Sequence, residues 1–308
     1  MITVVLPEIV PTQRHRFYDG GEPADDDGEG GEPPNREAEL QIRLDRRLVD
    51  GDEIFLLTRR IAYDDRHCGE IVVPPVYASF TSDLTSVPAL FTWLVPKTGA
   101  HLPAALIHDG LVGDPHDPTY ISTEGHTIDR VEADRIFRDG MADTGTGLVR
   151  RWLVWTAVTL ATMWARDSTS SRAAVRVYYQ VIVAATLASI AWLGYVATAD
   201  LFDRAWWLTY ELPWMGDRSF GAELVTGAAG AIAIPLALGL SWGRFHRAGF
   251  IAGVALGLLF HVTIALAAVL AVYQALERVA VAVPTLALRL GTAAVTLAAG
   301  AVFVIALL

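Results

Sequence analysis

The sequence predicts an α+β soluble domain at residues 39–168, followed by an all-α transmembrane domain of four helices. Two observations predict this fold class. In the soluble part, short runs in which apolar and polar residues alternate come first. Segments whose apolar residues recur at helical spacing follow. After a basic linker at 169–176, four apolar stretches reach the length that a bilayer requires. With 308 residues, of which 53% are hydrophobic and 19% charged, the chain is long enough for both parts.

The amino-terminal residues 1–38 are predicted to form a disordered acidic segment. Residues 19–37 combine glycine and proline with seven acidic side chains before Arg36, a composition that cannot bury a core. The first residues also lack the basic and apolar regions of a signal peptide, so we expect the soluble domain to stay in the cytoplasm.

The soluble domain is predicted to begin with three short antiparallel strands. Leu40–Leu44 and Glu53–Tyr63 alternate in part and are separated by a turn at Val49–Asp52. Glu70–Val73 forms a third strand, which ends at the following prolines because proline cannot donate to a strand ladder.

Longer periods predict four helices in the rest of the soluble domain, at about 88–95, 101–112, 129–143 and 147–166. The last of these is apolar, but Arg151 and Arg166 enclose only fourteen residues. That length is about 21 Å of helix, against a hydrocarbon core of about 30 Å. We therefore predict a buried or interfacial helix there rather than a span.

The membrane domain, residues 177–308, is predicted to contain four spans, at about 177–199, 224–243, 249–274 and 286–308. Arginines precede the first span and lie between the second and third, whereas the connection at 200–218 is mixed in charge and rich in aromatic residues. The positive-inside rule then places both termini and the soluble domain on the cytoplasmic side of an integral cell membrane protein.

Three glycines recur at four-residue spacing in the predicted third span. Gly249, Gly253 and Gly257 share one helix face and would let another helix approach closely. The partners expected for the chain are therefore the lipid bilayer and, through this stripe, other proteins or a second copy of the chain.

Three ionisable residues lie inside or near the spans. His261 extends the glycine stripe and fits either hydrogen-bonded packing or a transport role. Glu223 and Arg289 lie near the ends of their spans and either form an ion pair or are unrelated residues that reach toward the interface.

Composition excludes two kinds of site. The net charge of −10 disfavours binding to the phosphates of nucleic acid, so no nucleic-acid partner is expected. Cys68 is the sole cysteine, which excludes an intrachain disulfide and a metal site built from several cysteines.

The candidate catalytic residues are His108, Asp109 and Asp134. Neighbours on a helix point about 100° apart, so His108 and Asp109 face different partners. His108 has the chemistry of a general base, and Asp134 is the best placed carboxylate to orient it from the following helix, where Glu132 is a solvated or more distant acid. Asp109 is the candidate metal ligand; calcium or zinc is compatible with these donors but not required by the sequence.

The loop between the two helices is rich in oxygen and imidazole donors, which are Asp114, His116, Asp117, Glu124 and His126. It has no regular ligand spacing such as that of an EF-hand or a His-Glu-x-x-His helix. An ordinary polar loop is the simpler interpretation. The His108, Asp109 and Asp134 group itself is open to a second interpretation, in which buried polar bonds hold two helices together.

Three motifs occur in a familiar order. They are Val73–Pro88, with Asp83, Ser86 and Pro88 in its turn, then Ala105–Leu111 around His108 and Asp109, and then Glu132–Phe137 around Asp134. This arrangement, over residues of about 40–165, resembles the phage-associated family labelled domain of unknown function 1353. Ser82 stands where that family usually has threonine. The resemblance implies a phage-derived module, but no activity, because none is established for the family.

A looser resemblance is to the helix pair of prokaryotic and viral phospholipase A2. That resemblance implies His108 as base, Asp109 as calcium ligand and Asp134 as the residue that steadies the histidine. The glycine-rich calcium loop and the disulfide framework of those enzymes are absent here, and Val112 occupies the place of the customary tyrosine.

Two function classes remain. The first is a membrane-anchored interaction or structural module without catalysis. The second is a membrane-tethered hydrolase, acting on lipid or cell-envelope material through His108, Asp109 and Asp134. An HD-type phosphohydrolase and a Ser-His-Asp hydrolase rank lower, because the sequence lacks a suitable upstream histidine and a Gly-x-Ser-x-Gly turn. A His108 that reaches Asp134 and opens to a pocket favours the enzyme, whereas a sealed His108 disfavours it.

Overall fold

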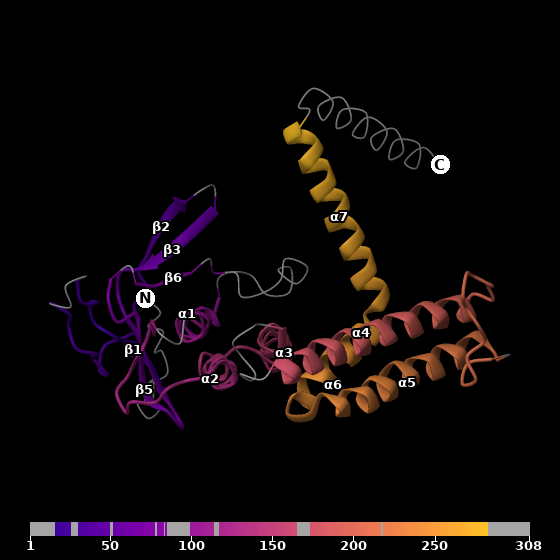
Figure 1. The fold of residues 1–308 in the computed structure, drawn as a ribbon, viewed down its shortest axis with the longest axis horizontal. Helices are drawn as coiled ribbons and strands as arrows, with labels where there is room; N and C mark the ends of the chain where they lie inside the picture. The colour runs from indigo at the N-terminus through magenta and orange to yellow at the C-terminus, as the bar shows by residue number, and fades with distance from the viewer. Residues whose placement is uncertain are drawn as a thin grey trace, which may run out of the picture.

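The computed structural model describes residues 16–25, 30–49, 52–77, 79–82, 84, 99–113, 117–164, 173–216 and 218–282. Two parts can be followed in Figure 1. The head consists of two small sheets with helices α1 and α2, and the bundle consists of helices α4, α5 and α6. Helix α3 lies between them.

The head contains two antiparallel sheets. One has the strand order β1-β4-β5-β7, with β1 at Phe17–Asp19, β4 at Ile61–Asp65, β5 at Gly69–Val73 and β7 at Ile121–Ser122. The other has the order β2-β3-β6, with β2 at Leu44–Val49, β3 at Asp52–Leu57 and β6 at Thr81–Ser82. Val49 and Asp52, the end residues of the predicted turn, pair with each other across β2 and β3.

Three expectations about the strands need correction. The strand predicted at Leu40–Leu44 lies one strand length later, at Leu44–Val49. The run predicted as one strand at Glu53–Tyr63 is divided between the two sheets, because the chain leaves β3 at Leu57 and enters β4 at Ile61. Strand β1 lies inside the segment 1–38 that we expected to be disordered. It is buried and pairs with β4, and the backbone N–H of Asn35 also donates to the carbonyl oxygen of Asp19 at 2.8 Å.

Three of the four helices predicted in the soluble part are present. They are α1 at Leu102–Leu111, α2 at Arg130–Asp143 and α3 at Leu148–Trp164; the helix expected at 88–95 lies outside the described residues. Helix α2 begins where Asp129 accepts a hydrogen bond from the backbone N–H of Glu132 at 2.8 Å, as an N-cap does. Apolar side chains from α1, α2 and the sheets form the core of the head.

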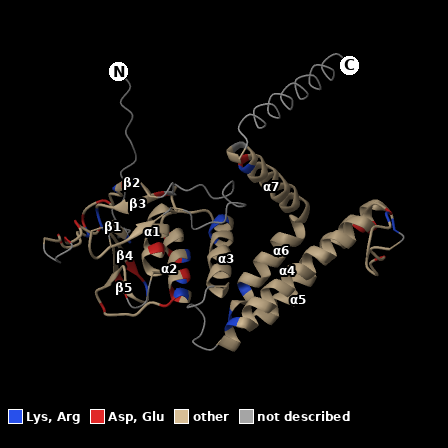
Figure 2. Ribbon diagram, turned by 45° about the horizontal axis from the view of Figure 1, so that its top comes forward, with Lys and Arg blue, Asp and Glu red and all other residues tan. Residues whose placement is uncertain are grey.

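The carboxyl-terminal part contains α4 at Ala173–Leu201, α5 at Phe220–Gly239, a 3₁₀ turn at Leu240–Phe245, α6 at His246–Leu258 and α7 at Phe260–Ala282. Among the described residues, three helical stretches are long and apolar enough to cross a membrane: Ala173–Leu201, Phe220–Leu258 and Phe260–Val279. In Figure 2 the charged residues gather on the head and near the ends of these helices.

The structure corrects the bounds of the predicted third span. The span expected at 249–274 is interrupted at Leu259, where α6 ends and α7 departs from the bundle in another direction (Figure 1). The first two predicted spans correspond to α4 and α5. The span expected at 286–308 lies outside the described residues, as does Arg289.

The glycine stripe of α6 packs within the chain. The chain reverses at Gly243, whose φ of 56° is left-handed, so that α6 runs back along α5. A Cβ atom on Gly249, Gly253 or Gly257 would lie within 3.0 Å of an atom of the turn or of α5. The stripe that we expected to serve partner proteins or self-association is therefore covered by the chain itself.

Helix α3 belongs to both parts of the molecule. Val154 and Val158 are buried in the core of the head. One turn further on, Met163 is fully buried in a second core with Trp242 and Phe245 of the bundle turn. Helix α3 therefore packs against both parts of the molecule, with one face buried in the core of the head and another in the core of the bundle.

Candidate functional site

His108 and Asp134 meet at the contact between α1 and α2. The Nε2 atom of His108 lies 2.9 Å from the Oδ1 atom of Asp134. The imidazole also stacks on the ring of Phe137, with centroids 4.8 Å apart and an angle of 25° between the planes. Phe137 follows Asp134 by three residues, so one face of α2 supplies both contacts.

Asp109 faces a different neighbour, as the helical geometry predicts. Its Oδ2 atom accepts a hydrogen bond from the hydroxyl of Ser82 at 2.6 Å, and the Ser82 oxygen in turn accepts from the backbone N–H of Leu84 at 3.0 Å. The Oδ1 atom of Asp109 is 3.9 Å from Nδ1 of His108, which is too long for a hydrogen bond but close enough for attraction between charges. His108 thus has a carboxylate on each side.

The electrostatics of this group favour a charged imidazole. Burial disfavours the imidazolium form of His108, but the negative charges of Asp109 and Asp134 and the hydrogen bond with Asp134 outweigh that effect and raise the pKa of His108. The imidazole therefore holds its proton more tightly than a free histidine does. It is well suited to a buried ion pair.

The group is closed off from solvent by the surrounding residues. The side chains of His108 and Asp134 expose 7% and 3% of their surfaces, and Asp109 exposes 17%. Among the described residues, Nδ1 of His108 and Oδ2 of Asp134 have no hydrogen-bond partner. The structure therefore brings the three predicted residues together, buries His108 and Asp134, and leaves Asp109 partly exposed.

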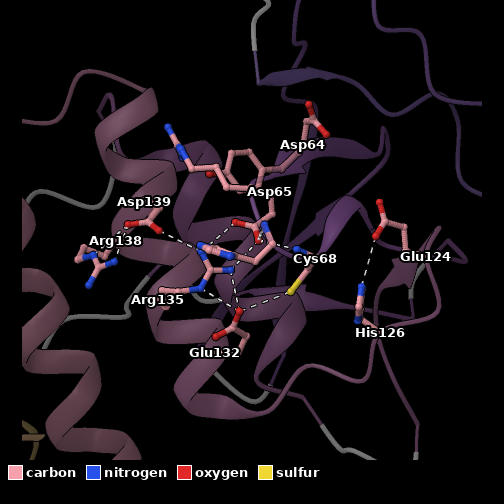
Figure 3. Close-up of polar contacts among 12 residues, drawn as sticks. Asp64, Asp65, Cys68, Glu124, His126, Glu132, Arg135, Arg138 and Asp139 are labelled. Atoms are coloured by element: carbon pink, nitrogen blue, oxygen red, sulfur yellow. Dashed lines mark hydrogen bonds and ion pairs between the residues drawn. The ribbon is translucent and has the colours of Figure 1, made fainter. Parts of the chain in front are cut away.

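The other predicted motif residues cannot be placed. Asp83, Ser86 and Pro88 lie outside the described residues, as do Asp114 and His116 of the loop. Two further loop residues, Glu124 and His126, form an exposed pair at 3.4 Å (Figure 3).

Sequence reasoning missed a second polar group, which is centred on Arg135 of α2 (Figure 3). Arg135 contacts Asp65 of β4 at 2.6 Å, Glu132 at 2.8 Å and Asp139 at 3.0 Å. The Asp65 side chain is fully buried and also accepts hydrogen bonds from the backbone N–H groups of His67 and Cys68. The sequence did contain a signal, because Glu132 lies three residues before Arg135 and Asp139 lies four residues after it, so that all three share one helix face.

In this second group, Asp65 and Arg135 stay charged. Burial raises the pKa of Asp65, but hydrogen bonds from Arg135 and from the two backbone N–H groups outweigh it and lower the pKa to about 2. Asp65 and Arg135 therefore form a charged pair that ties the sheet to α2 throughout the physiological pH range.

Asp65, Cys68 and Glu132 lie close enough together to hold a metal ion. The guanidinium of Arg135 already provides the cation for both carboxylates. Burial first, and then the charges of Asp65 and Glu132, raise the pKa of Cys68 to about 11, so the thiol keeps its proton at neutral pH. We assign no metal to this group, because a thiol ligand must be deprotonated and the arginine would have to leave.

One family model matches the chain. It is described as "Protein of unknown function (DUF1353)" and covers residues 55–158, which run from β3 into α3 and include His108, Asp109, Asp134 and Arg135. No curated protein and no solved structure matches the chain. The resemblance to the phospholipase A2 helix pair stays a prediction. At residues 55–158, the chain is similar to the DUF1353 proteins, a family of unknown function.

Proposed function

We propose that this chain is a membrane-anchored interaction or structural module, in which α3 holds the head in a fixed position at the cytoplasmic face of a membrane. The observation that supports the proposal is that α3 is buried in the core of the head and also in the core of the bundle. Val158 is buried in the head and Met163 in the bundle, only five residues apart. A tether that only kept an enzyme near a membrane would not need this rigid junction.

The His108 group supports the same proposal. Its imidazole stacks on Phe137, contacts Asp134, is almost fully buried, and has a raised pKa. These are the properties of a polar link between two helices, and a proton-transfer residue would need access to a substrate. His108 and Asp134 then serve to keep the head rigid.

The β2–β3 hairpin is the surface that we propose for a protein partner. It projects from the head in Figure 1, and β2 is the edge strand of its sheet among the described residues. Leu48 and Val49, near its tip, expose 67% and 48% of their surfaces. An open strand edge with exposed apolar side chains is a common site for a partner to add a strand.

Site-specific photocrosslinking in intact cells of the source organism tests this proposal. A photoreactive residue at Leu48 should form a crosslink to one defined protein. The crosslink should disappear when Val49→Asp is added, and it should be absent when the photoreactive residue replaces Thr123, which is exposed in the turn after β7. Equal crosslinking from Leu48 and Thr123, or none from Leu48, would contradict the proposal.

A membrane-tethered hydrolase is the second candidate, and one observation favours it. Ser82, Asp109, His108 and Asp134 form a continuous polar row in which Nδ1 of His108 has no partner among the described residues. In this alternative, His108 is the base, Asp134 orients it, and Asp109 binds a metal ion or water. The purified full chain and its His108→Asn variant should then differ in lipid hydrolysis and in calcium or zinc content. Equal results for two folded proteins would exclude the hydrolase.

A further inference from the structure

The bundle contains a cavity that neither the head nor the anchoring role explains. It has a volume of about 210 Å³ and lies between α4 and α5, beside the junction of α6 and α7. Its cause is the length of α6. Helix α6 has 13 residues and α5 has 20, so at 1.5 Å per residue α6 is about 10 Å shorter. The groove between α4 and the first turns of α5 is therefore left open.

The wall of the cavity is mostly apolar. Small residues of α4 and α5, including Gly194, Ala197 and Gly227, create the space, and the aromatic rings of Trp214 and Phe260 border it. Apolar walls with aromatic faces suit the body of a small organic molecule, and aromatic faces also attract cations.

One charged side chain, Glu223, lines this cavity. Glu223 belongs to the first turn of α5 and is 7% exposed. Among the described residues its carboxylate has one hydrogen-bond donor, the backbone N–H of Arg218 at 3.3 Å, and no ion-pair partner within 4.0 Å. A buried carboxylate without a cation is unfavourable, so the site is better satisfied when a positive charge enters it.

Two other polar side chains at the cavity, Thr198 and His261, form a hydrogen bond with each other. The Thr198 hydroxyl donates to the carbonyl oxygen of Gly194 at 2.6 Å. Because that proton is used, the contact of 2.8 Å between Thr198 Oγ1 and His261 Nε2 requires His261 to donate. Glu223 is therefore the wall residue that is available to a charged ligand.

We propose that this cavity binds a small organic cation with an apolar body, whose charge is held by Glu223 and whose body lies against Trp214 and Phe260. An inorganic divalent cation does not fit, because one carboxylate in an apolar wall offers too few oxygen ligands. A quaternary ammonium group does fit, since it needs no directed hydrogen bonds and favours aromatic surfaces.

The test uses two probes of the same shape. Benzyltrimethylammonium carries the charge, and neopentylbenzene is its uncharged carbon counterpart. Binding of each to the full chain is measured by calorimetry in neutral detergent micelles, for the wild type, for Glu223→Gln, and for Glu211→Gln. Glu211 is an exposed acid of the neighbouring connection and serves as the matched control.

The wild type and Glu211→Gln should bind the cation at least tenfold more tightly than the neutral probe. Glu223→Gln should bind the cation at least tenfold more weakly than the wild type does, while its affinity for the neutral probe stays within about twofold. Equal affinity of the wild type for both probes would overturn the proposal, as would an unchanged affinity of Glu223→Gln for the cation. The comparison of probes on the wild type keeps the test valid if the variant fails to fold.

Discussion

His108 and Asp134 form a buried contact of 2.9 Å that links the two helices of the head. Helix α1 carries the histidine and α2 carries the carboxylate, and Phe137 covers the imidazole on the same side. The contact therefore acts as a cross-link inside the region that matches the family model. The nearby carboxylates raise the pKa of His108, which makes the stability of the head depend on pH.

The pH dependence has a definite sign. The pKa of His108 is raised above 6.5 in the folded protein, so the folded state binds the proton more tightly than the unfolded chain does. The stabilisation is complete below about pH 6.5 and is lost as the pH rises through the folded pKa. Thermal unfolding of the full chain in detergent should show the largest difference in melting temperature between wild type and His108→Gln below that pH.

The control for this prediction is His126→Gln, because His126 is exposed and pairs only with exposed Glu124 among the described residues. This variant should unfold like the wild type across the whole pH range. A difference between wild type and His108→Gln that stays constant, or grows as the pH rises, would contradict the ion pair.

Removal of Arg135 should destabilise the head strongly. Arg135→Met leaves the Asp65 carboxylate buried and without its cation, which should lower the free energy of unfolding by about 3–5 kcal/mol. Arg46→Met removes an exposed pair with Glu53 and should cost less than about 1 kcal/mol. Chemical denaturation, followed by near-ultraviolet circular dichroism, measures both.

Acid should weaken the ion pair between Asp65 and Arg135 only at very low pH. The pKa of Asp65 is lowered from 3.8 to about 2, so its stabilisation is present above 3.8 and is lost as the pH falls through about 2. The difference in the free energy of unfolding between wild type and Arg135→Met should therefore persist at mildly acidic pH. If it disappears near pH 5, the pair does not stabilise the protein in this way.

Cys68 should react slowly with thiol reagents. With a pKa of about 11, only about one thiol in a thousand is ionised at about pH 8, and the side chain is also buried. Because Glu132 contributes to that shift, Glu132→Gln should speed the reaction with a disulfide reagent, whereas Glu124→Gln should not. The sole cysteine of the chain makes the absorbance readout unambiguous. Equal rates for the wild type and Glu132→Gln would contradict the assigned cause.

The glycine stripe of α6 offers a matched pair of variants. A Cβ atom on Gly257 would lie 2.7 Å from the carbonyl oxygen of Ala231, a backbone atom that cannot easily move. Gly257→Ala should therefore lower the melting temperature of the bundle, by an overpacking cost of about 1–3 kcal/mol. Gly221→Ala, with no atom within 4 Å, should leave it unchanged or raise it slightly. A similar melting temperature for both variants would show that α6 does not lie on α5 in this way.

The sequence predicted the His108 contact because helical spacing determines which residues share a face. Asp134 and Phe137 are three residues apart, and both reach His108. The same rule identified the glycine stripe, but not its partner. A pattern on one helix shows that something approaches closely, while the identity of the neighbour depends on the turn at Gly243.

The features that sequence reasoning missed depend on contacts between distant residues. Strand β1 belongs to an acidic, glycine-rich segment and forms because Phe17 and Tyr18 pair with β4, more than forty residues away. The break at Leu259 has no proline or glycine at that position to signal it. The Asp65 contact of Arg135 likewise joins residues 70 positions apart.

The central claim is that α3 fixes the head to the bundle, and a distance measurement between spin labels tests it most directly. Cysteines at Glu124 in the head and Leu224 in α5 are both exposed and can carry labels in a Cys68→Ser background. In the full chain reconstituted into bilayers, a rigid junction predicts one narrow distance distribution, which broadens when Val158→Asp disrupts the core that α3 shares with the head. A broad distribution in the chain without the Val158→Asp change would contradict the claim, because the head would then move freely relative to the membrane helices.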